Sequence, residues 1–380
     1  MAPTLLRDGL SSTARPHVQS ADNRFYRPEL DVLRFLAFAW VFWGHSPSPT
    51  STLSPLNDIG AFGLCLFFML SAYLIISLLL RERAVSGTIN VKSFALRRVL
   101  RIWPLYFLGI ALGCASGIFW PDMRLPWQAV AAMVLLSTNF YVLAHGWVLG
   151  VINPLWSIAL EEQFYLVIPW VARFRSRRIL TVALLLTIAV AEITLFYLGR
   201  RGASYNSGVW PNSFVQFQFF ATGGLIALWN DRHSNTLGLG SRTLLYAVGV
   251  ICWLIASIHY HLRWLDPAVP HNLLTGYGLV LIGTTAMFFS FLQVDLHFPK
   301  SLVYLGRISF GLYVYHSFLV RLVLQLWYTH LPSGWIRNHP ILTTPIVFAA
   351  TVGTAALSYK FFERPILLIK QRFETVRTRT

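Results

Sequence analysis

Two adjacent carboxylates, Glu161 and Glu162, lie in the middle of a long apolar run. A charged side chain inside a bilayer is costly, so such a pair is a candidate functional site. Successive residues of a helix diverge by about 100°, so one carboxylate can face a cavity while the other needs a separate partner. Ser157 shares a helix face with Glu161, and Tyr165 shares one with Glu162. A purely structural interpretation would require two buried pairings.

The apolar segment from Glu29 to His45 carries three further candidates, Asp31, Arg34 and His45. In a helix, Arg34 and His45 would share one face, about 16 Å apart along the axis. They cannot touch at that distance, but they could hold the two ends of one long ligand. The alternatives are that Arg34 pairs with Asp31 or extends to the inner membrane surface, and that His45 is an interfacial residue.

Arg98 and Arg101 lie one helical turn apart, directly before another apolar run. Guanidinium groups at this spacing suit the oxygens of a polyphosphate. The alternative is that the pair only holds its loop on the inner side of the membrane.

His316 and Glu363 are weaker signals. His316 has the context of a packed, hydrogen-bonded histidine, and Glu363 that of an inner-surface residue paired with Arg364 or Lys360. The sequence has no nucleotide-binding loop and no metal-ligand cluster. We therefore expect neither a bound metal nor a tightly bound cofactor.

The composition indicates that lipid surrounds most of these segments. Apolar residues make up 55% of the 380 positions and charged residues 12%, with a mean hydropathy of +0.56. Runs such as 61–80 and 178–198 are continuously apolar, which favours spanning helices over the alternating pattern of a barrel. The three cysteines fall within apolar runs and are typical of small core residues. The net charge of +16 is spread over loops, so we expect no nucleic-acid partner.

The apolar runs predict an all-α, polytopic membrane protein with about ten transmembrane helices. The predicted spans are 29–45, 61–80, 102–118, 154–172, 179–198, 213–230, 243–259, 272–292, 308–328 and 341–361. With both termini in the cytoplasm, 24 of the 31 basic residues lie in inner segments and five in outer ones. An eleventh span at 127–145 would place four arginines outside, so we expect this segment to be re-entrant or interfacial, near a functional site.

The predicted organisation is one membrane domain between two tails. We expect a polar cytoplasmic tail at 1–27 without a cleaved signal peptide, a membrane domain at 28–365 and a basic cytoplasmic tail at 366–380.

Five motifs occur in an order that resembles acyltransferase family 3, the bacterial integral-membrane O-acyltransferases of sugars and polysaccharides. The motifs are Arg34 with His45, the Phe68–Tyr73 stretch around Ser71, Arg98 with Arg101, the Glu-Glu-Gln-Phe-Tyr stretch at 161–165, and Tyr359 with Glu363 and Pro365. The resemblance runs from about Arg27 to Pro365. It is to the stand-alone form, without the periplasmic domain that some members append.

This resemblance implies transfer of an acyl group, expected to be acetyl, from acyl-coenzyme A to a hydroxyl of a sugar or cell-surface glycan at the bacterial inner membrane. His45 would act as general base, oriented by Glu161 or Glu162. The expected substrate-binding residues are Arg34, Ser71, Arg98, Arg101, Ser157 and Tyr165, with Arg98 and Arg101 on the donor phosphates. The arginine pair is then on the inner side and His45 near the outer end of its span. We expect the pantetheine arm of the donor to connect them along the Arg34 to His45 face.

A different class of protein remains an alternative. In a transporter or flippase of a lipid-linked sugar or acyl group, the buried carboxylates and the histidine would form a proton relay or substrate site. A non-catalytic scaffold would leave the carboxylate pair unexplained.

The distribution of basic residues makes the topology testable. Reporter fusions within 84–95 and at the C-terminus should report a cytoplasmic location, and fusions within 262–270 an external one, because Lys and Arg are retained on the inner side. An external C-terminus would contradict the ten-span topology and require 127–145 to cross the membrane.

Overall fold

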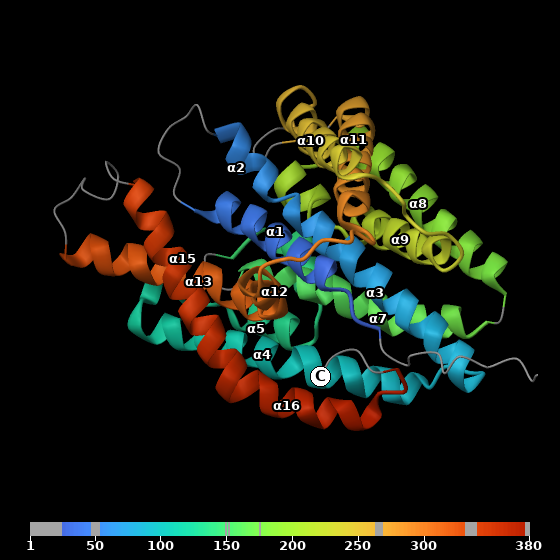
Figure 1. Ribbon diagram of the computed structural model, residues 1–380. Coiled ribbons are helices and arrows are strands. Elements are labelled where there is room, and N and C mark those ends of the chain that lie inside the picture. Colours follow the sequence, from blue (N-terminus) through green and yellow to red (C-terminus); the bar gives the residue numbers. More distant parts are fainter. Residues whose placement is uncertain are drawn as a thin grey trace, which may run out of the picture.

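The computed structural model describes residues 25–46, 54–148, 150, 153–174, 176–262, 269–330 and 340–376, which are organised mainly as α-helices (Figure 1). The longer helices are α1 Pro28–His45, α3 Gly63–Ser86, α4 Val91–Phe119, α7 Trp156–Arg173, α8 Arg177–Arg200, α9 Ser213–Asn230, α10 Leu239–Ile258, α11 Pro270–Phe291, α13 Ser309–His330 and α15 Pro340–Ser358. The shorter ones are α2 Ser54–Gly60, α5 Trp127–Val134, α6 Thr138–His145, α12 Lys300–Arg307 and α16 Arg364–Lys370, with a π-helical segment, η5 Tyr359–Glu363, between α15 and α16.

The apolar surface of the bundle identifies a multi-pass integral membrane protein. Within the described ranges, six helical segments are long and apolar enough to cross a bilayer, and a bent pair, α12 with α13, would make a seventh. In α8 only 22% of the apolar window is buried inside the protein, so most of that helix faces outward. Side chains such as Leu186 and Ile193 are exposed there, as expected for contact with lipid.

Each of the ten predicted spans coincides with a helix, but the structure does not establish ten crossings. Helices α1 and α7 are 18 residues long and carry three charged residues each, and α9 is 18 residues long with two glutamines in its first half. By length and hydropathy alone, these three helices are therefore not candidate membrane spans. The ten-span count and the orientation of the termini stay predictions.

The segment 127–145 forms two eight-residue helices, α5 and α6. The turn between them holds Leu136 with φ of 54°. Each helix is about 12 Å long, whereas the hydrocarbon core is about 30 Å thick, so neither can cross alone. Asn139 of α6 instead braces α7, because its Oδ1 accepts a hydrogen bond from Gln163 Nε2 at 2.9 Å.

Helices α1 and α3 run through the middle of the bundle, between α10 and α11 on one side and α4 and α16 on the other (Figure 1). Helix α1 packs against α3, α12 and α13. Its contact with α12 depends on Gly306, where a Cβ atom would lie 1.8 Å from the Asp31 carbonyl oxygen. Any larger residue would push the two helices apart.

The chain bends by 71° between α12 and α13. The span predicted over 308–328 coincides with α13, which begins at Ser309, and the change of direction lies at its start, at Ile308. A second irregular element, the π-helical turn η5, follows α15. Irregular backbone at membrane depth is tolerated where it is buried in protein or lines a cavity, and both elements contribute residues to the cavity described next.

Candidate active site

A cavity of about 980 Å³ opens between α1, α3, α4, α7, α12, α13, α15 and α16. This is at the upper end of the range of small-molecule and cofactor pockets, about 300–1,000 Å³. Basic residues outnumber acidic ones in its lining. The basic residues are Arg27, Arg34, Arg97, Arg98, Arg101, Arg307, Lys360, Arg364 and Lys370, and the acidic ones are Asp31, Glu82, Glu161, Glu363 and Glu374.

Some of these cations are neutralised within the protein. Arg97 forms a buried ion pair with Glu82, with Nη2 to Oε2 at 2.6 Å, and also donates to the Phe373 carbonyl at 2.7 Å. Lys370 pairs with Glu374 at 2.8 Å. These contacts fold the segment after α16 over the cavity, so that residues up to Val376 line it.

In the part of the chain that the structure describes, three partly buried arginines have no such partner, and Arg364, which also has none, is exposed. Among the described residues, no carboxylate forms an ion pair with Arg98, Arg101 or Arg307. The Nε atoms of Arg98 and Arg307 are buried without a hydrogen-bond acceptor. Arg98 instead lies over the rings of Phe94 and Tyr165, at 5.7 and 5.8 Å from their centroids. An unpaired cation in a partly desolvated cavity is costly, so these groups favour an anionic ligand.

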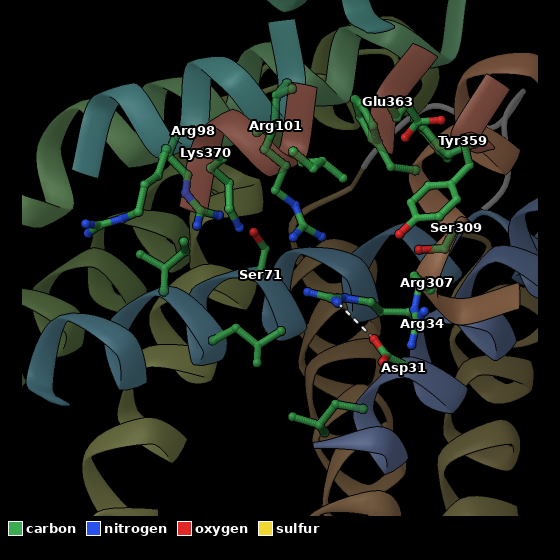
Figure 2. A pocket seen from close by; sticks show the side chains of 18 of the residues that line it. Asp31, Arg34, Ser71, Arg98, Arg101, Arg307, Ser309, Tyr359, Glu363 and Lys370 are labelled. Carbon is green, nitrogen blue, oxygen red and sulfur yellow. Dashed lines mark hydrogen bonds and ion pairs between the residues drawn. The ribbon is translucent and has the colours of Figure 1, made fainter. Parts of the chain in front are cut away.

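The close view of the cavity separates its cations into two groups (Figure 2). Arg98 and Arg101 of α4 lie with Lys370 of α16 on one side of the cavity. Arg34 and Arg307 lie together on another side, where Arg34 Nη1 contacts Asp31 Oδ1 at 3.2 Å. Arg98 and Arg101, one helical turn apart in α4, both line the cavity.

Only one carboxylate of the Glu161 and Glu162 pair lines the cavity. Glu161 Oε2 accepts a hydrogen bond at 2.8 Å from the Tyr165 hydroxyl, which is also hydrogen-bonded to Ser71 Oγ. Glu162 points away, and its Oε2 accepts from Trp103 Nε1 at 3.2 Å. Although the three-residue spacing puts Tyr165 and Glu162 on one face, the Tyr165 hydroxyl bonds to Glu161, four residues earlier.

Ser157 lines the same cavity but its hydroxyl is already engaged. The Tyr313 hydroxyl donates to the Pro154 carbonyl at 2.7 Å and can accept a hydrogen bond at 2.7 Å from Ser157 Oγ, which also lies 3.0 Å from that carbonyl. These three groups form a fixed part of the cavity wall.

His45 does not line the cavity but lies at the other end of α1. Its Nδ1 is 2.8 Å from the Val41 carbonyl, and its ring packs edge-on against that of His316, with centroids 5.0 Å apart. His316 is fully buried, with Nδ1 2.6 Å from the Tyr313 carbonyl. Because Tyr313 lines the cavity, the two imidazoles lie directly behind its wall.

Two expectations about the surroundings of the site need correction. Neither glutamate contacts His45, whose Nδ1 is held by a backbone carbonyl one turn earlier. In addition, no residue of 127–145 lines the cavity. The irregular backbone at the site is instead the bend after Arg307 and the π-helical turn η5.

Sequence reasoning missed three contributors to the site. Arg307 and Lys370 were counted only as inner-segment charges, and Tyr313 was not considered. His316, a weak signal in the sequence, packs against His45, and its position three residues after Tyr313 is the available clue. Within the described part of the chain, no group of three or more His, Cys, Asp or Glu side chains could hold a metal ion.

The fold and the site together define a multi-pass helical membrane protein with a basic cavity. The chain belongs to acyltransferase family 3, because the model of that family, described as an acyltransferase domain, matches residues 27–360. The match includes every motif on which the resemblance rests except its last residues, Glu363 and Pro365.

Curated relatives of the chain are named as O-acetyltransferases, in agreement with the family. The chain is 27% identical over 376 residues to the peptidoglycan O-acetyltransferase OatA of Listeria monocytogenes, covering 90% of this chain and 56% of that protein. It is 25% identical over 370 residues to the O-acetyltransferase OatA of Staphylococcus aureus, covering 90% and 57%. The chain thus spans just over half the length of these relatives. No solved structure matches it significantly.

The neighbours Arg97 and Arg98 should respond differently to the loss of charge. Arg97→Met leaves Glu82 buried and unpaired, so we expect a loss of about 3–5 kcal/mol in stability, the usual cost of breaking a buried pair. Arg98→Met removes a cation that has no ion-pair partner among the described residues, so thermal unfolding of the purified protein in detergent should show no destabilisation. Equal losses of stability in both variants would contradict this division.

Proposed function

We propose that this protein is a membrane O-acyltransferase that transfers an acyl group, most simply acetyl, from acyl-coenzyme A to a hydroxyl of a sugar or cell-surface glycan. The observation that carries the proposal is a large cavity with unpaired arginines in a chain of an acyltransferase family. The names of the relatives support an acetyl group and a glycan acceptor. Acyl-coenzyme A would be a substrate, not a resident cofactor.

Arg98 and Arg101 would bind the phosphates of the donor. Both are cavity residues on the second and third turns of α4, and Lys370 adds a third cation beside them (Figure 2). Guanidinium groups match phosphate oxygens with two parallel hydrogen bonds. The ligand would also remove the cost of leaving these cations unpaired.

His45 would be the general base. A backbone carbonyl can only accept, so the contact with Val41 assigns the proton to Nδ1 and leaves Nε2 with a free lone pair. That nitrogen is the one able to take a proton from an acceptor hydroxyl as it attacks the thioester carbonyl. When the C–S bond breaks, the imidazolium would return the proton to the departing coenzyme A thiolate. Arg34, on the same helix, would bind the donor or stabilise the developing oxyanion. The acyl group must pass the wall formed by Ser157 and Tyr313 to reach the histidine.

The remaining parts of the proposal concern the membrane. We propose ten spans with both termini in the cytoplasm, a single acyltransferase domain at 28–365, donor entry from the inner side and acceptor entry from the outer side. Glu161, held by Tyr165, would position substrate in the cavity. Glu162 lies outside the cavity lining and would contribute indirectly, by fixing the position of Trp103. A transporter or flippase with the same residues would bind its cargo but would not turn over an acyl donor.

Turnover by the purified protein tests the proposal. Labelled acetyl-coenzyme A and a glycan acceptor should give an acylated glycan, and Arg98→Gln with Arg101→Gln should raise the KM for the donor much more than that for the acceptor. Lys92→Gln removes a charge from the exposed start of the same helix, outside the cavity, and should change neither. If the double variant inserts correctly and its donor KM is unchanged, the two arginines do not bind the donor and serve only to hold their segment on the inner side of the membrane.

The role of His45 gives a second measurement. His45→Ala should lower kcat by about 10²- to 10⁴-fold, the typical contribution of a general base, while the variant still inserts and folds. His145→Ala, an exposed histidine of α6, is the matched control. Turnover near that of the wild type would assign the proton transfer to His316.

A further inference from the structure

We infer that Arg307 forms a second anion subsite, separate from Arg98 and Arg101, and that it binds the 3′-phosphate of the nucleotide donor. This inference rests on the proposed function, because it divides the donor's phosphates between two walls of the same cavity. It assigns a specificity role to a residue that lies outside the recognised motifs.

The position of Arg307 is fixed by the backbone. It is the last residue of α12, next to Gly306, whose close approach to the Asp31 carbonyl packs α12 against α1. The 71° bend then turns α13 away, so the Arg307 side chain lies at the corner and lines the cavity. Helix contacts on both sides hold this corner in place.

The charge on Arg307 is not compensated by the protein. Its Nε is buried with no acceptor, and no carboxylate among the described residues pairs with its guanidinium. The adjacent Arg34 differs in this respect, because Asp31 pairs with it at 3.2 Å. On this wall of the cavity, Arg307 is therefore the cation whose burial an anionic ligand would offset.

The surroundings of Arg307 suit a phosphate monoester. Ser309 opens α13 two residues later and also lines the cavity (Figure 2). The N-terminal end of a helix carries a partial positive charge and offers unsatisfied N–H groups, a common setting for phosphate. One guanidinium fork, one hydroxyl and one helix end are donors for a single phosphate group, whereas the several cations of the Arg98 group match a diphosphate.

Coenzyme A carries anionic groups of both kinds, a diphosphate and a separate 3′-phosphate on the ribose. Two cationic walls facing one cavity therefore fit this donor better than a nucleotide with one phosphate cluster. Arg307 would discriminate the complete donor from an analogue that lacks the 3′-phosphate.

The test compares two ligands with the full chain in detergent or nanodiscs. Binding of acetyl-coenzyme A and of acetyl-3′-dephospho-coenzyme A is measured by titration calorimetry. The wild type should bind the complete donor more tightly by about 10-fold, the size of one charge-assisted hydrogen bond. Arg307→Gln should bind both ligands alike, with the affinity that the wild type shows for the dephospho form. Lys300→Gln, at the exposed start of the same helix, should keep the full discrimination.

Two further variants separate binding from folding. Arg307→Lys keeps the charge and should keep part of the discrimination, and Ser309→Ala should reduce it by a smaller factor. Full discrimination in a folded Arg307→Gln protein, or an equal loss of affinity for both ligands, would overturn the subsite and leave the proposed function intact. A wild type that binds neither ligand would overturn both.

Discussion

The cost of holding guanidinium groups inside an apolar bundle governs the organisation of this protein. Lipid surrounds the helices, so a charge in the interior must be met by a partner, a backbone carbonyl, water or a ligand. The structure uses several of these solutions within one cavity. Arg97 has Glu82 and the Phe373 carbonyl, and Arg34 has Asp31, whereas Arg98, Arg101 and Arg307 have no carboxylate of the described chain. The division separates arginines whose charge is met by a carboxylate within the protein from arginines whose charge is not.

The same constraint explains why the backbone is irregular at the cavity. A regular span satisfies every backbone polar group within its own helix, whereas irregular backbone at membrane depth is tolerated only where it is buried in protein or lines a cavity. The bend before Ser309 and the π-helical turn at Tyr359–Glu363 both depart from that regularity, and both supply polar lining. The histidine pair lies beyond this polar region, in aromatic surroundings that include Phe38 and Tyr313.

Much of the helical architecture could be predicted from the sequence, because long apolar runs leave few other options in lipid. The spacing of Arg98 and Arg101 also follows from helical periodicity, and so does the divergence of Glu161 and Glu162, but periodicity does not say which of the two glutamates lines the cavity. Contacts between distant segments do not follow from periodicity. Nothing local to Arg97 shows that Glu82 and Phe373 meet it. Around Arg307 the sequence shows only that an apolar run begins at 308, and not that a separate helix, α12, precedes it at an angle of 71°. The histidine pair depends on the packing of α1 against α13, which a single sequence does not encode in a readable pattern.

The contact between Arg97 and the Phe373 carbonyl also has a consequence for biosynthesis. The two residues are separated by 276 positions, so Arg97 is synthesised long before its second partner has been translated. Glu82 is already present, and it can neutralise Arg97 while the remaining helices insert. The wall formed by residues 370–376 can close only after that segment has left the ribosome. A nascent chain can therefore acquire most of its bundle while its cavity is still open on one side.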